Sequence, residues 1–292
     1  MKSLKFFVFI SVFAFSTSLF SQDKAAYKFF NSKSKSTDYE KLLKECEKAD
    51  IVFFGELHNS PICHWLQLEL TQDLFKVKKE KLVLGAEMYE ADNQLIINEL
   101  LAGKITDKNF KDEAKLWPNN ETDYKPLLSF AKTNKLKFIA TNIPRRYAAM
   151  VNKRGLESLD SLEAEAKFLI APLPIKYDST LSGYKKMLES DDKSASSHIT
   201  PNLPKAQAIK DATMAYFIYK NLIEGGSFIH YNGTYHSENY QGILWYLKLL
   251  NPNLKIVTIA STEQESIEKL DEESENMADF ILCMPENMTK TR

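Results

Sequence analysis

The stretch Asp50-Ile-Val-Phe-Phe-Gly55-Glu56-Leu57-His58 places four large apolar residues directly before a glycine, a carboxylate and an imidazole. A short, continuous apolar run suits a strand that is covered on both faces, as in a parallel sheet. Similar runs follow at residues 81–86 and 136–140, and a helix-length segment comes after each of them. Because strands that alternate with helices predict βαβ units, we expect an α/β fold with a mainly parallel sheet flanked by helices.

The later part of the chain continues this pattern after a long interruption. Three more strand-like runs lie at residues 227–231, 254–259 and 279–283. The segment of about 144–224, between the third and fourth runs, has helical patterning, so we predict a helical lobe inserted there. Apolar residues at three- and four-residue spacing predict a helix over about 205–222 with one face packed inward. Residues 190–197 are poor in apolar side chains, which favours a solvated linker over a lid.

The N-terminus has the pattern of a secretory signal peptide. Lys2 and Lys5 precede an apolar run over residues 6–20, which is shorter than the roughly 20 residues that a membrane-spanning helix needs. We expect cleavage between Ser21 and Gln22, and no cysteine lies near that point to carry a lipid anchor. These features predict a periplasmic or secreted protein in which residues 22–292 form a single α/β domain.

Charge and cysteine content exclude several classes of protein. The chain has 38 Lys and Arg against 39 Asp and Glu. This balance does not provide the basic face that nucleic-acid binding requires. Cys46, Cys63 and Cys283 are widely spaced and odd in number, so they predict neither a disulfide framework nor a zinc site. One disulfide remains an alternative, and in that case one thiol stays free within the monomer.

Four of the predicted strands end in side chains that can carry chemistry. Glu56 and His58 follow the first strand, and Glu87 follows the second. Arg145 follows the third strand, and His236 follows the fourth. Because the carboxyl ends of parallel strands meet at one edge of a sheet, we expect these five side chains to form one site.

Two of these strand ends leave alternatives open. A buried carboxylate such as Glu87 needs a cation, a metal ion or a hydrogen-bond donor beside it. One alternative is an ion pair with Arg145 or Arg146; the other is that an arginine binds a ligand carboxylate or propionate bidentately. His64 lies six residues beyond His58, and we expect it to be a packing residue.

Several motifs together resemble the ChaN-like haem-binding family in order and spacing, across almost the whole chain after the leader. The motifs are Phe54-Gly55-Glu56-Leu57-His58, Ala86-Glu87-Met88-Tyr89, Trp117 with Tyr124 and Pro126, Asn142-Ile-Pro144-Arg145, Gln207-Ala-Ile-Lys-Asp211-Ala-Thr-Met214-Ala215 and Gly233-Thr-Tyr-His236. The resemblance extends to a wider superfamily that includes Tiki metalloproteases, TraB proteins and erythromycin esterases.

This resemblance implies haem binding, a role in iron or haem acquisition, a homodimer and an outer-membrane uptake system as partner. It also implies a tyrosine ligand to the haem iron, a role for which Tyr89, Tyr147 and Tyr235 are candidates near the strand ends. Four large side chains are candidates for lining a porphyrin slot, although each also suits an ordinary core: Trp65, Met88, Met150 and Met214.

The same polar residues permit two rival functions. In a metal-dependent hydrolase of the Tiki kind, His58, His236 and Glu87 would hold a divalent ion that lowers the pKa of a bound water. In a metal-free hydrolase of the erythromycin-esterase kind, an imidazole acts as general base and Arg145 stabilises the oxyanion. A binding module without chemistry is the third alternative, in which these residues form only a structural network.

Overall fold

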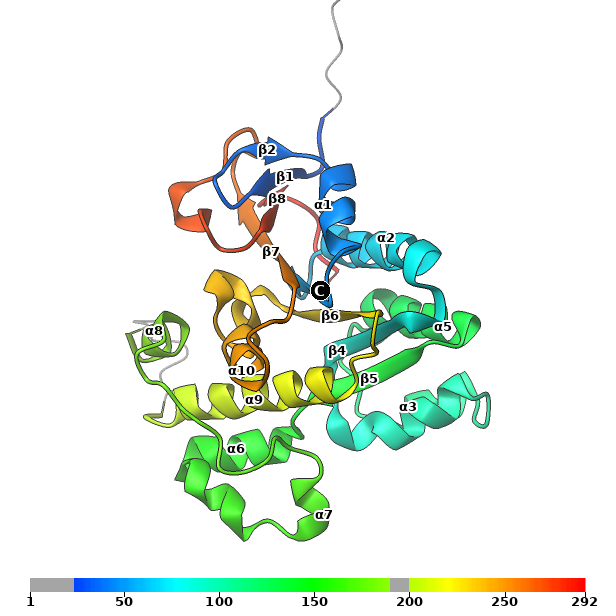
Figure 1. The fold of residues 1–292 in the computed structure, drawn as a ribbon, viewed down its shortest axis with the longest axis vertical. Helices are drawn as coiled ribbons and strands as arrows, with labels where there is room; N and C mark the ends of the chain where they lie inside the picture. Colours follow the sequence, from blue (N-terminus) through cyan, green and yellow to red (C-terminus); the bar gives the residue numbers. More distant parts are fainter. Residues whose placement is uncertain (1–23, 190–199, 292) are drawn as a thin grey trace, which may run out of the picture.

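The computed structural model describes residues 24–189 and 200–291, and one eight-stranded sheet runs through them. The predicted signal peptide at 1–21 and the predicted linker at 190–197 lie outside the described residues. The order of the strands is β2-β1-β8-β7-β3-β6-β4-β5, so the strand that carries Glu56 lies near the centre of the sheet (Figure 1).

All six strands predicted from apolar runs form, and they pair in parallel. They are β3 (Ile51–Glu56), β4 (Leu82–Glu90), β5 (Lys137–Asn142), β6 (Ser227–Gly233), β7 (Ile256–Gln264) and β8 (Phe280–Pro285). Two short strands that we did not predict, β1 (Lys28–Asn31) and β2 (Ser36–Thr37), extend the sheet beyond β8 in antiparallel pairing. The fold is therefore α/β with a mostly parallel, mixed sheet.

One face of the sheet is covered by helices from the first half of the chain. These are α1 (Tyr39–Cys46), α2 (Pro61–Lys78), α3 (Gln94–Leu101), α4 (Asp107–Glu113) and α5 (Lys125–Asn134). Their buried side chains form one cluster with Val52, Phe54 and Leu84 of the strands. Helix α1 begins where the Asp38 side chain accepts a hydrogen bond from the Lys41 backbone N–H at 2.9 Å, which satisfies an otherwise free donor.

The opposite face is covered by α9 (Leu203–Lys220) and α10 (Ile243–Leu250), which pack on Phe53, Val83 and Phe228. The predicted helical lobe between the third and fourth strands is confirmed. It holds α6 (Arg145–Arg154), α7 (Ala164–Lys167), α8 (Ser182–Glu189) and α9. Figure 1 shows α6 and α7 beyond α9, at the end of the molecule away from β1 and β2.

Short helical turns complete the fold. They are η1 (Lys79–Lys81), η2 (Ala91–Asn93), η3 (Asn120–Tyr124, a π-helical turn), η4 (Leu156–Ser161), η5 (Thr234–His236), η6 (Glu238–Tyr240) and η7 (Glu272–Ser274). Two of them position the site, because η3 precedes α5 and η5 follows β6 directly.

The predicted helix over about 205–222 with one face packed inward is confirmed as α9, and α9 is buried over more than that one face. Ala208, Met214 and Ala215 are as fully buried as Ile209, whereas Phe217 is partly exposed. The physical reason is that α9 packs against β5 and also against α6, α8 and α10, so it is covered almost all round.

Within residues 24–189 and 200–291, each helix is too short or too polar to span a lipid bilayer. All three thiols are free and buried: Cys46, Cys63 and Cys283.

Candidate functional site

The carboxyl ends of β3, β6 and β7 meet where a polar cluster opens onto a groove. Glu56 is the last residue of β3, and the strand register places it opposite Gly233 at the end of β6. The groove has a volume of about 800 Å³ and is lined by the β3, β6 and β7 loops together with the turn at Asn119. This is the edge of the sheet at which a parallel fold is expected to hold its ligand.

Glu56 is a fully buried carboxylate that accepts three hydrogen bonds. Its Oε1 atom accepts from His58 Nδ1 at 2.8 Å and from the Tyr124 hydroxyl at 2.9 Å. Its Oε2 atom accepts from Gln67 Nε2 at 2.6 Å. Because each oxygen has a donor, the buried carboxylate is satisfied and its position is fixed.

His58 is the predicted imidazole that reaches the groove, since 42% of its side chain is exposed. Its Nδ1 faces Glu56, so in the neutral imidazole Nδ1 carries the hydrogen and Nε2 keeps its lone pair. Trp117 contacts the ring edge-to-face, with ring centres 4.9 Å apart. Burial lowers the pKa of His58, but the Glu56 hydrogen bond and the Glu87 charge outweigh burial and raise that pKa above 6.5.

A glycine is required beneath this imidazole. A Cβ atom on Gly233 would lie 2.8 Å from His58 Nε2 and 3.0 Å from His58 Cε1. Gly233 also donates its backbone N–H to Glu87 Oε2 at 2.8 Å, so one residue supports both His58 and Glu87.

Glu87 and His236 meet directly below the groove. The distance from His236 Nε2 to Glu87 Oε1 is 3.1 Å, and the distance from His236 Nδ1 to Asp211 Oδ1 is 2.5 Å. Burial lowers the pKa of His236, but the charges of Glu87 and Asp211 outweigh burial and raise that pKa to about 10. Burial in turn raises the pKa of Glu87, and the His236 cation more than compensates, holding it well below its usual range. His236 is therefore a buried cation between two carboxylates.

The predicted metal set of His58, His236 and Glu87 is not assembled as a metal site. Among residues 24–189 and 200–291, no group of three His, Cys, Asp or Glu side chains has a geometry that could hold a metal ion. The physical reason is that a metal needs a deprotonated imidazole nitrogen, and both ring nitrogens of His236 face carboxylates.

Arg145 does not join the other four predicted side chains. It is exposed at the start of α6, where its Nε lies 3.7 Å from Glu90 Oε1 and its backbone N–H donates to Glu90 Oε2 at 3.0 Å. Arg146 pairs with Asp92 at 2.5 Å. The alternative of an ion pair between Glu87 and an arginine does not form, because Glu87 turns inward to His236 while α6 follows the outermost strand of the sheet.

The three candidate tyrosines lie in three different environments. Tyr89 is buried, and its hydroxyl donates to Asn120 Oδ1 at 2.7 Å. Tyr147 lies on α6, with the Arg146 guanidinium 4.5 Å from its ring centre. Tyr235 alone of the three lines the groove, and its hydroxyl donates to the Gly183 carbonyl.

The predicted slot residues also do not converge. Met88, Met214 and Met150 belong to three separate apolar clusters, and Trp65 is half-exposed on α2. His64 is buried, as expected for a packing residue, with its Nε2 bonded to the His58 carbonyl at 3.2 Å.

Helices supply site residues that strand-end reasoning missed. Gln67 and Tyr124 bind Glu56, and Asp211 binds His236. Tyr184 of α8 donates its hydroxyl to Asp211 Oδ2 at 2.7 Å. A signal for Tyr124 and Asp211 was present, because both lie within the motifs that carry the family resemblance.

The fold and the site together define an α/β protein with a carboxylate-held imidazole in a groove at the carboxyl edge of a parallel sheet. The family described as haem-binding uptake, Tiki superfamily, ChaN matches residues 42–247, and the chain belongs to this family.

Individual proteins are also similar to this chain. A solved structure of cofacial haem binding to ChaN of Campylobacter jejuni has a TM-score of 0.65 at 18% identity, over 88% of this chain and 96% of that chain. An erythromycin esterase in its open conformation has a TM-score of 0.49 at 12% identity, over 88% and 97% of the two chains. The chloroplastic protein Reticulata-related 5 of Arabidopsis thaliana is 27% identical over 206 residues, which are 66% of this chain and 27% of that protein. The chain thus spans about a quarter of the length of this curated relative.

Proposed function

We propose that this chain is an exported haem-binding protein that acts in iron or haem acquisition, with haem bound in the groove and His58 as the iron ligand. One observation carries the proposal: the Nδ1 atom of His58 is held 2.8 Å from the buried carboxylate of Glu56, while 42% of the side chain is exposed at the groove. A histidine ligand to iron generally donates its second nitrogen to such an acceptor, which fixes the ring and raises its basicity.

The groove has the size of a small-molecule site, and part of its lining is apolar. Its volume of about 800 Å³ lies within the range of small-molecule sites, and the lining includes Leu57, Tyr235 and Met277. The charged groups in that lining that are not buried are Glu238, Glu263, which pairs with Lys290, and the imidazole of His58; the Glu56 carboxylate is buried. These carboxylates would repel the haem propionates. We therefore expect the propionates to project from the open side of the groove into solvent.

Ligation by His58 would depend on pH. Iron binds the deprotonated Nε2, and the pKa of His58 is raised above 6.5 by Glu56 and Glu87 after burial has lowered it. We therefore expect haem affinity to fall as the pH drops through that raised pKa, because protons compete with iron for Nε2.

A hemin titration followed by the Soret band tests the proposal. The purified protein is compared with His58→Ala and with Tyr235→Phe, which removes the hydroxyl of the one candidate tyrosine that lines the groove. We expect one saturable hemin per chain, loss of the Soret shift in His58→Ala, and a retained shift in Tyr235→Phe. Loss in Tyr235→Phe with retention in His58→Ala would refute His58 as the ligand and favour a tyrosine.

Export rests on the N-terminal sequence, in which Lys2 and Lys5 precede an apolar run and a polar stretch starts at Gln22. Fractionation of cells that express the full-length chain tests it: mature protein of reduced mass is expected in the periplasm or medium. The homodimer and the outer-membrane uptake partner stay predictions of the family resemblance.

A second candidate function uses the same pair of residues for hydrolysis without a metal. Glu56 orients His58 as it would orient a general base, so Nε2 could take a proton from water at the groove. The exposed position of Arg145 leaves this mechanism without the predicted oxyanion donor. A panel of activated esters, assayed with wild type and His58→Ala, tests it: turnover that depends on His58 in hemin-free protein supports the hydrolase.

A further inference from the structure

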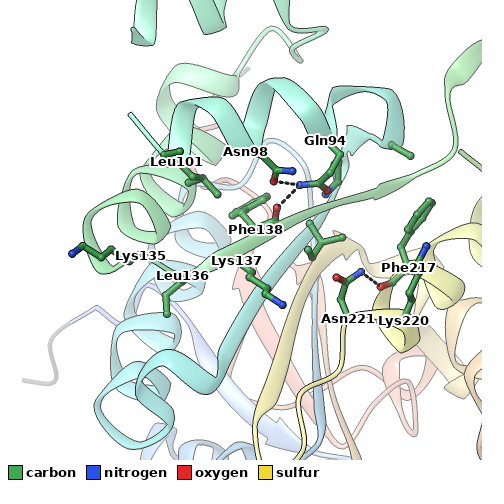
Figure 2. A pocket seen from close by; sticks show the side chains of 14 residues that line it. Gln94, Asn98, Leu101, Lys135, Leu136, Lys137, Phe138, Phe217, Lys220 and Asn221 are labelled. Carbon is green, nitrogen blue, oxygen red and sulfur yellow. Dashed lines mark hydrogen bonds between the residues drawn. The ribbon is translucent and has the colours of Figure 1, made fainter. Parts of the chain in front are cut away.

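A second groove runs along the free edge of β5, the outermost strand of the sheet (Figure 2). Helices α3 and α9 form its two sides, and its volume is about 730 Å³. It shares no lining residue with the groove at His58. We propose that this edge groove binds a carboxylate-bearing apolar ligand of the long-chain fatty-acid class.

The floor and sides of the edge groove are largely apolar. Leu101 comes from α3, Phe138 and Ile139 come from β5, and Phe217 comes from α9. Phe217 and Leu101 are only partly buried, whereas Phe138 and Ile139 are buried. Apolar side chains that remain partly accessible along one groove provide a surface for an alkyl chain.

The charged side chains in the lining are all lysines, at positions 135, 137 and 220, without a single Asp or Glu. Figure 2 shows Lys135 extending away from the other labelled residues. Lys137 is the first residue of β5, and Lys220 is the last residue of α9. None of these ammonium groups lies within 4.0 Å of a carboxylate in the described part of the chain. Lys220 instead lies 5.5 Å from the Tyr216 ring centre. An apolar groove with unpaired cations at its rim complements a ligand with one carboxylate and a long apolar body.

An added β-strand is the other occupant that an edge strand invites, and the structure disfavours it. The Gln94 side chain donates from Nε2 to the Phe138 carbonyl at 3.0 Å and accepts at Oε1 from the Ala140 backbone N–H at 2.7 Å. These two bonds occupy the backbone groups through which a new strand would pair. Side-chain contacts therefore remain as the main source of affinity, which suits a small amphiphile.

Binding of 11-(dansylamino)undecanoic acid, measured by its fluorescence, tests the proposal on the purified protein. The test variant reverses two rim charges, Lys137→Glu with Lys220→Glu. The matched control makes the same charge change at two exposed lysines elsewhere, Lys33→Glu with Lys153→Glu. A third variant, Ala102→Trp, fills the groove at an exposed position of its lining.

We expect saturable binding that weakens roughly tenfold or more in the rim variant and in Ala102→Trp, but not in the control. The methyl ester of the probe should bind at least several-fold more weakly than the acid, and added salt should weaken the acid only. Binding should persist in His58→Ala, which separates this groove from the haem site.

Three results would overturn the proposal: no saturable binding, equal binding of acid and ester, or equal binding by the rim variant and its control. An extended peptide of alternating Glu and Val residues tests strand addition. Saturable binding of this peptide with none of the fatty-acid probe would assign the edge groove to a protein partner instead.

Discussion

The buried cation at His236 predicts how the stability of this protein depends on pH. The pKa of His236 rises from 6.5 to about 10 in the folded state, because the charges of Glu87 and Asp211 outweigh the effect of burial. A base with a raised folded-state pKa stabilises the fold fully below pH 6.5 and loses this contribution as the pH rises through 10. The whole contribution is on the order of 5 kcal/mol, and about 2 kcal/mol of it should be lost between pH 6.5 and about 8.5.

Urea unfolding followed by circular dichroism measures this loss, with wild type and His236→Gln compared at each pH. Wild type should lose about 2 kcal/mol of unfolding free energy over this range, whereas the variant should lose much less. The pH range ends near 8.5 because burial also raises the pKa values of the three thiols. Above that pH, ionisation of these thiols would add a further pH dependence to the unfolding free energy. His58 contributes in the same direction in both proteins. Because the charge of His236 lowers the pKa of His58, that pKa should rise further in the variant, so the difference between the two curves is a lower limit for the contribution of His236.

The variant should also be about 3–5 kcal/mol less stable than wild type at pH 6.5, because two buried carboxylates lose their shared cation. If His236→Gln does not fold, Glu87→Gln replaces it, since removing one negative charge lowers the pKa of His236 and flattens the curve. Parallel pH dependences in wild type and in whichever variant folds would refute the assignment of His236 as a buried cation.

Four further predictions follow from close contacts. Gly233→Ala should weaken hemin binding roughly tenfold in a Soret titration while the protein stays folded, because the new Cβ would displace the His58 ring; unaltered affinity would contradict this. Gly85→Ala should lower the unfolding free energy by about 1–3 kcal/mol in urea, because its Cβ would lie 2.5 Å from Phe228 Cζ, and a neutral result would show that the ring moves freely. Gln94→Ala should lower the unfolding free energy by about 1–3 kcal/mol and increase self-association in sedimentation experiments, because it frees two backbone groups of the edge strand β5. A monodisperse variant would argue against Gln94 as a block to strand pairing. A thiol reagent should react with the protein only after unfolding, and rapid reaction of the native protein would contradict the burial of Cys46, Cys63 and Cys283.

Apolar runs predicted the parallel core because those strands are buried on both faces and so carry a continuous signal. Strands β1 and β2 escaped prediction because they are only four and two residues long, so the two buried residues of β1, Phe29 and Phe30, make too short an apolar run to indicate a strand. Sequence also could not show that α9 is enclosed on several sides, since the spacing of apolar residues reports one packing face and not the neighbours that cover the rest.

For the site, proximity of strand ends brought Glu56, His58, Glu87 and His236 to one edge, but it did not determine where each side chain points. Glu87 turns toward His236. Arg145 is the first residue of α6, which follows the outermost strand β5, and its side chain is exposed to solvent. Tyr124 approaches Glu56 from a turn that is 68 residues further along the chain, so spacing along a strand carries no information about it.

The pairing of β3 with β6 and β7 determines when, during synthesis of the chain, the groove can first form and bind a ligand. The partners of residues 51–54 lie at residues 228–231 and 256–259, so the groove needs contacts across most of the chain. At synthesis rates of roughly 5–20 residues per second, His58 waits on the order of 10–40 s for the strands that complete its surroundings. During that interval the groove has not yet formed, so no ligand can bind in it. A protein that crosses a membrane unfolded would therefore bind its ligand only after crossing.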